Sequence, residues 1–256
     1  MTAINKNEPT TLEKMQGLKW AISFTASNSV YVQLTFFGSL FVLFLDTLGF
    51  SKTEIGGLLS LLPLTGLIAL FIGPQIARFG YKRAFLSFFA LRTVASALLL
   101  LTPLVITWVT GRGVLFFIVI ILIFFSIFRS IGLSGWMPWN TEFVPPSVRG
   151  KYSAFNNISS NAGAFITVSL ASLALGDSPS ITDFNLMFGI GIAFAVLSLG
   201  FMARVPGGGP IASSGESVAK LGEILKVFKD RNMTKYIIGR SLVGLSMGPL
   251  ASFVPL

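Results

Sequence analysis

The residues best suited to chemistry in this sequence are a few polar and basic side chains set inside long apolar stretches. Arg92 follows Arg83 by nine residues, which is about 13 Å of helix, and lies within an apolar run. A guanidinium group at that depth must be paired or hydrated, so Arg92 is a candidate for binding a polar or anionic ligand. The alternative is an ion pair or carbonyl contact that locks two helices together, and the sequence leaves both open.

Amide, phenol and further basic groups make a second set of candidates. Asn28 and Tyr31 are three residues apart and would share a helix face, from which they could orient a ligand. Asn157 and Asn161, four apart, would also share a face. Hydrogen bonding between helices is the alternative for all four. Arg129 could bind a ligand or extend to lipid head groups, because it stands five residues from the predicted end of its apolar run.

Several kinds of chemistry are excluded by composition. The chain contains no His and no Cys, which removes imidazole bases, thiolates and the commonest metal ligands. Its carboxylates near the apolar runs fall at their edges: Asp46, Glu54, Glu142, Asp177 and Asp183. We therefore expect no metal site, no cofactor and no enzyme active site. A proton relay would need a buried carboxylate or His, so coupling to an ion or proton stays open.

The basic residues inside the apolar runs are Arg92, Arg129 and Arg240. Arg240 lies near the start of its run and, like Arg129, could bind a ligand or extend to lipid head groups. The three arginines make the predicted interior net positive. This charge favours an anionic or polar organic solute as the ligand.

Composition indicates which elements hold these residues. Of 256 residues, 53% are hydrophobic and 11% charged, with a mean hydropathy of +0.78, whereas soluble domains are roughly 25% charged. These values predict an all-α polytopic membrane protein. The net charge of +9 is distributed over short gaps rather than a basic face, so we expect no nucleic-acid partner. The first apolar run is too long for a signal-peptide core and should be retained in the bilayer.

A membrane-spanning helix needs about 20 apolar residues, and seven stretches come near that length. They are Trp20–Leu45, Glu54–Ala77, Ala84–Val109, Val114–Ser134, Tyr152–Leu175, Phe184–Ala203 and Met233–Leu256. With the N-terminus inside, fifteen Lys and Arg residues, Arg129 included, fall on the inner side and two in the outer gaps. This bias predicts a cytoplasmic N-terminus. Trp136 and Trp139, just past the fourth stretch, would anchor at the membrane interface, and a gating or ligand-binding role is the alternative.

Four segments follow from this pattern. They are a cytoplasmic tail (1–19), a six-helix bundle (20–204), a cytoplasmic linker (205–232) and the start of a second bundle (233–256). The linker opens with Gly, Pro and Ser residues that we expect to be flexible, and it continues with a pattern that fits either an amphipathic surface helix or a solvated charged segment. Because the chain stops inside an apolar run, we expect a truncated protein, with a complete six-span half that dimerises as the alternative.

Two motifs in the gaps suggest a family. The stretch GPQIARFGYKR separates the second and third runs, and VPPSVRGKYSA enters the fifth. Together with the span count and the long linker, they resemble the major facilitator superfamily over essentially the whole chain. The positions that match the family's signature loop are Gly73, Arg78, Gly80, Lys82 and Arg83. The positions that match the second motif are Pro145, Arg149 and Gly150.

The physics of the first motif is consistent with a short membrane turn. Gly73 and Gly80 would allow close backbone approach and positive φ in a tight reversal, and the basic residues would lie at head-group depth. The family carries an Asp where this chain has Ala77. The resemblance therefore implies a gate at this loop without its usual carboxylate.

The resemblance implies a bundle of two inverted three-helix repeats that works by alternating access. In the family the first and fourth spans line the cavity, which favours Asn28 and Tyr31 as ligand-binding residues. We expect a transporter of a small organic solute, monomeric at full length, in the plasma membrane, which in a bacterium is the inner membrane. A half-transporter that works as a dimer and a membrane protein without transport activity are the alternatives.

Overall fold

The computed structural model describes residues 9–64, 68–176, 178–210, 234, 235 and 239. It contains two compact units, Met1–Ile211 and Ala212–Leu256, and every element discussed below belongs to the first. The described residues form helices and connecting turns without a strand, which confirms the all-α prediction. Most of the predicted seventh span, the amphipathic part of the linker and Arg240 lie outside the described residues.

The predicted first span consists of two helices, α1 (Thr11–Leu34) and α2 (Ser39–Thr47). α1 begins nine residues before the predicted start, because Thr10 and Glu13 form a capping box that closes its first turn. The prediction of one continuous helix was wrong over 35–38. A Cβ at Gly38 would overlap the carbonyl oxygen of Gln33, so the break between the helices requires glycine.

The second and third spans lie close to their predicted ranges. The second contains α3 (Lys52–Leu64) and α4 (Ile68–Phe79). The third contains α5 (Tyr81–Ala97), the 3-10 turn η2 (Leu98–Leu101) and α6 (Thr102–Trp108). Pro103 explains the tighter turn, because it lacks an N–H and its ring crowds the carbonyl group four residues earlier.

The fourth span is longer than predicted. α7 (Gly111–Phe143) continues nine residues past Ser134, with Pro138 inside the helix. Trp139 and Phe143 are fully buried on this extension and hold it against the other helices. Trp139 is therefore a core residue, and the expectation that it anchors at the membrane interface was wrong.

The last two described spans are α8 (Arg149–Leu175), entered through the turn η3 (Pro146–Val148), and α9 (Ile181–Ala203). A capping box of Ser180 and Asp183 starts α9. Among the described residues, five segments are long and apolar enough to cross a membrane. The helices α3 and α4, of 13 and 12 residues, are not among them.

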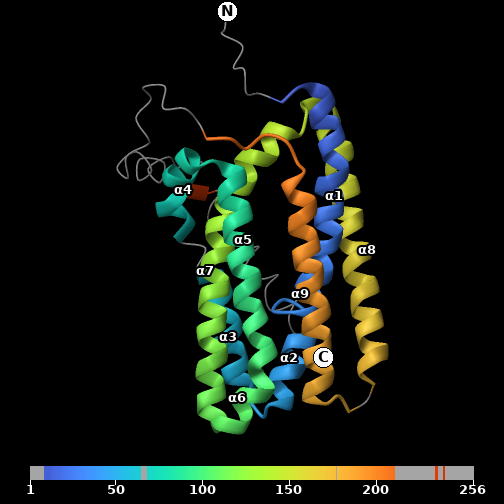
Figure 1. Ribbon diagram of the computed structural model, residues 1–256. Helices are drawn as coiled ribbons and strands as arrows, with labels where there is room; N and C mark the ends of the chain where they lie inside the picture. Colours follow the sequence, from blue (N-terminus) through green and yellow to red (C-terminus); the bar gives the residue numbers. More distant parts are fainter. Residues whose placement is uncertain (1–8, 65–67, 177, 211–233, 236–238, 240–256) are drawn as a thin grey trace, which may run out of the picture. The chain divides into compact units, whose positions relative to one another are not determined.

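Packing in the first unit places a polar layer between two apolar clusters. α5 lies alongside α7, and α1 packs against both α8 and α9 (Figure 1). One cluster includes Phe41, Phe44 and Phe188, and the other includes Phe24, Phe85 and Trp139. Along both α1 and α5, a short polar stretch separates the residues of the two clusters. This layer contains most of the predicted ligand-binding residues.

Candidate functional site

Arg92 is the centre of the polar layer. It is 2% exposed, so it faces the protein interior as expected. Its Nη2 donates to Oδ1 of Asn28 on α1 at 2.9 Å, whereas its Nε has no hydrogen-bond partner. The sequence of α5 contains no Asp or Glu, and neither does α1 beyond Glu13. Arg92 is thus a buried cation with a neutral amide as its side-chain acceptor.

Aromatic rings surround the guanidinium group. Its central carbon lies 3.9 Å from the ring centre of Phe89 and 4.7 Å from that of Tyr31. Ser96 donates to the carbonyl oxygen of Arg92 at 2.9 Å and also bonds the Tyr31 hydroxyl, which must then be the donor. Cation–π contacts of this kind stabilise a desolvated cation by about 2 kcal/mol or more. They do so without using the N–H groups of Arg92, which leaves donors free for a ligand.

Arg129 lies further from the end of its helix than the sequence predicted. Because α7 continues to Phe143, Arg129 is 14 residues from the end of the helix, about 21 Å along its axis. The guanidinium carbon lies 4.6 Å from the ring centre of Phe37, in the turn after α1. Arg129 is half-buried on the interior side of α7.

The register of α5 and α7 puts the two arginines at one level. The ring of Phe85 on α5 lies 5.4 Å from that of Trp136 on α7, centre to centre. One turn further along α5, Phe89 fills the space that a Cβ at Gly132 would occupy. Since the helices are antiparallel, three more residues along α5 and three fewer along α7 give Arg92 and Arg129.

The other predicted ligand residues are not part of this layer. Asn157 and Asn161 lie on the exposed side of α8, whose closest packing is against α1, where Gly163 approaches Ser29. Arg240 lies outside the described residues. A ligand-binding role for these three residues stays a prediction.

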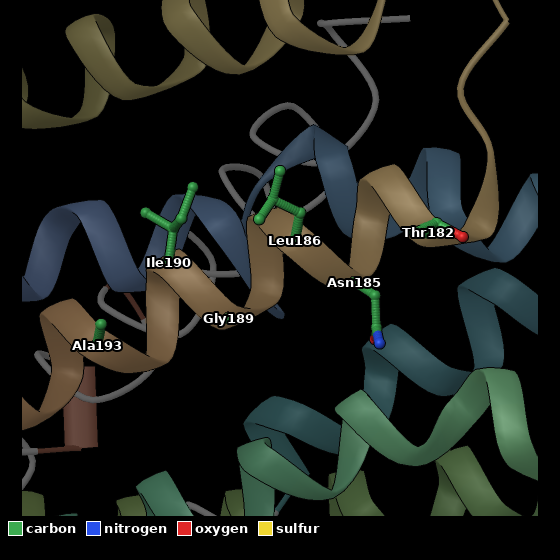
Figure 2. Close-up of a pocket in the computed structure, with 6 residues that line it drawn as sticks. All are labelled: Thr182, Asn185, Leu186, Gly189, Ile190 and Ala193. Carbon is green, nitrogen blue, oxygen red and sulfur yellow. The ribbon is translucent and has the colours of Figure 1, made fainter.

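A separate shallow pocket lies along α9 and is unsuited to a polar solute. All six lining residues come from this helix: Thr182, Asn185, Leu186, Gly189, Ile190 and Ala193. Leu186 and Ile190 point away from Asn185 (Figure 2), which donates to the carbonyl oxygen of Leu100 at 3.1 Å. The amide group of Asn185 is thus already bonded to the protein.

The signature loop joins α4 to α5 through Gly80. This residue has φ +99° and precedes the first turn of α5, so it supplies the positive φ predicted for the reversal. Gly73 does not: it lies inside α4, which continues to Phe79, and a Cβ there would meet no described atom within 4 Å. Arg78 ends α4, where a positive charge is favourable, and both Arg78 and Arg83 are exposed.

Residues Val205–Pro210, hereafter the strap, cross the end of the bundle and pack against this loop (Figure 1). Nζ of Lys82 donates to the Val205 carbonyl oxygen at 2.6 Å, and the backbone N–H of Lys82 donates to the Gly208 carbonyl oxygen at 2.9 Å. Nε1 of Trp139 donates to the Pro206 carbonyl oxygen at 2.9 Å. The carboxylate of Glu142 accepts from the Gly208 N–H at 3.0 Å. The expectation that the linker is flexible from its first residues was therefore wrong for the strap.

The second motif forms the entry to α8. Pro145 is buried, and its carbonyl oxygen accepts from the Val148 N–H at 3.2 Å. Arg149 and Gly150, the first two residues of α8, are exposed. The motif thus forms a turn, and the charge of Arg149 lies on the surface of the described part of the chain.

Sequence reasoning missed the aromatic partners of the arginines. Phe89 precedes Arg92 by three residues, which is the spacing of neighbours on one helix face. Phe37 has no such signal, because its position depends on the break between α1 and α2. The strap was also missed, since three consecutive glycines usually indicate a flexible segment.

Comparison with known proteins gives a match to one family. The family model described as Major Facilitator Superfamily matches residues 23–256. Comparisons with curated proteins and with solved structures find no match.

Proposed function

Given that the chain belongs to the major facilitator superfamily, a family of membrane transporters, we propose that it moves a small anionic or polar organic solute by alternating access. The solute binds in the polar layer between the two apolar clusters, and the bundle then exposes that layer to either side of the membrane in turn. The chain is an integral, multi-pass membrane protein. The proposal adds a cytoplasmic N-terminus, a plasma-membrane location and a monomeric full-length form.

The observation that carries this proposal is the incomplete pairing of Arg92. A buried guanidinium group with a free Nε and no carboxylate on its own helix is costly unless another acceptor completes its shell. An anionic solute supplies that acceptor. Asn28 orients the guanidinium group through its amide oxygen, and the rings of Phe89 and Tyr31 fix its plane.

Solute counterflow in proteoliposomes tests the proposal. The complete gene product is reconstituted, the vesicles are loaded with an unlabelled organic acid, and uptake of the same labelled acid is followed. An alternating-access carrier accumulates label transiently against a large internal pool, whereas a channel does not. A panel of organic anions, cations and neutral solutes is used, with and without a pH gradient. Absence of saturable counterflow for every solute would overturn the transport mechanism, and movement of cations or neutral solutes alone would overturn the anionic preference.

A further inference from the structure

We infer that the solute is an organic dianion, such as a dicarboxylate or a phosphate monoester, and that Arg92 and Arg129 bind it together. This inference rests on the proposed transport function and names the substrate class of the same site. It depends on three features of the described residues: the common level of the two arginines, the absence of a countercharge near them, and their unequal burial.

The register of α5 and α7 brings both guanidinium groups to one level of the bundle. Arg92 and Arg129 occupy facing positions of antiparallel α5 and α7, as the Phe85–Trp136 and Phe89–Gly132 pairs establish. The carbon atom of the Arg92 guanidinium lies 6.0 Å from the ring centre of Phe125, and that ring lies 6.0 Å from Phe37. Arg129 stacks on Phe37. The two cations therefore flank one pair of aromatic rings.

The charge at this level is uncompensated within the helices that hold it. No Asp or Glu occurs in α5, in α1 after Glu13, or in α7 before Glu142. Two positive charges in a low-dielectric region repel each other, and each keeps a desolvation cost. A monoanion compensates one of them and leaves the other, whereas a dianion compensates both. Arginine also suits this ligand class, because its planar fork binds carboxylate and phosphate oxygens through two parallel hydrogen bonds.

Burial gives the two arginines different tasks. Arg92 is almost fully buried, but Arg129, Phe37 and Asn28 are only half-buried. Arg129 is thus the more accessible of the two arginines. An incoming solute contacts Arg129 first with one anionic group, and it reaches Arg92 with the other once it has entered the layer.

A charge series on fixed scaffolds tests this inference. Succinate, phthalate and glycerol 3-phosphate are each compared with a monoanionic analogue, namely the monoamide or the methyl ester, and the acids also with the neutral diamide. The readouts are competition against counterflow and thermal stabilisation of the purified full-length protein. We expect the best ligand of the series to be a dianion that binds at least about tenfold more tightly than its monoanionic partner, since hydrogen bonds to charged groups are the strong ones.

Matched variants assign the effect to the two arginines. Arg92→Gln and Arg129→Gln should each bring the dianion-to-monoanion affinity ratio close to one, and Arg129→Lys should retain part of the preference. Arg112→Gln, which changes an exposed arginine at the start of α7, should leave the ratio unchanged. If Arg92→Gln fails to fold, the half-buried Arg129 still provides the test.

Failure of this inference differs from failure of the proposed function. Counterflow of monoanions that matches or exceeds that of dianions overturns the dianion inference and leaves anion transport intact. A dianion preference that survives both glutamine variants also overturns it, because other residues would then select the charge. Absence of any counterflow overturns the proposed transport function itself.

Discussion

Lys82 and Arg92 lie ten residues apart on α5, and both are basic side chains next to aromatic rings, but their donors are used differently. Lys82 donates to the Val205 carbonyl oxygen at 2.6 Å beside the Trp139 ring. Arg92 donates to Asn28 at 2.9 Å and keeps a free Nε. Lys82 joins two segments of the protein, whereas Arg92 retains capacity for another acceptor.

The supply of acceptors explains this difference. At the end of α9 the chain leaves the helix, so the carbonyl groups of the strap are free to accept from Lys82 and Trp139. In the middle of α1 and α7 each carbonyl group already accepts a hydrogen bond within the helix, so a buried arginine there finds fewer free acceptors. A basic residue at a helix end thus tends to be satisfied by the protein, and one in mid-helix is available to a ligand.

The largest expected effect comes from removing the aromatic support of the strap. Trp139→Ala deletes a fully buried indole and its hydrogen bond to Pro206, and it should cost about 3–5 kcal/mol of stability. The measurement is thermal unfolding of the purified protein. Trp108→Ala, at an 81% exposed position, is the control. Equal losses of stability in the two variants would mean that the packing of Trp139 against the strap does not contribute to the core.

A carboxylate beside Arg92 should give this residue an acceptor within the protein, as Lys82 already has. Asn28→Asp places an anion where an amide oxygen now lies 2.9 Å from the guanidinium group, so Arg92 gains an internal partner. We expect the KM for an anionic solute to rise by about 10- to 100-fold, while the melting temperature stays equal or increases. Asn28→Ala, which removes the acceptor without adding charge, should raise the KM less. Unchanged anion transport in the aspartate variant would show that Arg92 does not bind the solute.

Backbone strain at the strap gives a smaller and purely structural effect. Gly208 has φ +72°, and a Cβ there would lie 2.8 Å from the Lys82 backbone nitrogen and 2.9 Å from the Trp139 ring. Gly208→Ala should therefore destabilise the protein by about 1–3 kcal/mol. The matched control is Gly209→Ala, because a Cβ at that position would meet no described atom within 4 Å. Similar melting temperatures for the two variants would contradict the close packing of the strap.

The sequence predicted the spans better than their ends. Apolar length and basic gaps located the five described segments that are long and apolar enough to cross a membrane, because burial in lipid requires long apolar helices whatever their partners. The break before Gly38 and the extension to Phe143 depend on contacts between segments far apart in the chain, which periodicity does not report. Burial of Trp139, for example, needs both the signature loop and the strap.

The site residues could be predicted where a polar side chain lies deep within an apolar run. Arg92, Asn28 and Tyr31 could be selected because polar groups within an apolar run must meet one another or a ligand. Their mutual contacts follow from how α1 faces α5. Asn157 and Asn161 satisfied the same criterion, but they lie on the exposed side of α8. Their spacing shows that they share a helix face, but it does not show whether that face points into the protein or away from it.

Reciprocal exchange of the two basic residues should give the smallest effects and the sharpest contrast. Arg92→Lys keeps the charge but loses the planar fork that stacks on Phe89 and can bind an oxyanion through two bonds, so kcat/KM for an anionic solute should fall about tenfold. Lys82→Arg keeps a donor for the Val205 carbonyl oxygen, and its transport rate should stay within about twofold of the parent, because a single carbonyl acceptor does not require a fork. Both variants are compared in the same counterflow assay, with melting temperatures as the control for folding. If Lys82→Arg were the more damaging exchange, free donors in mid-helix would not distinguish a ligand site from a structural contact.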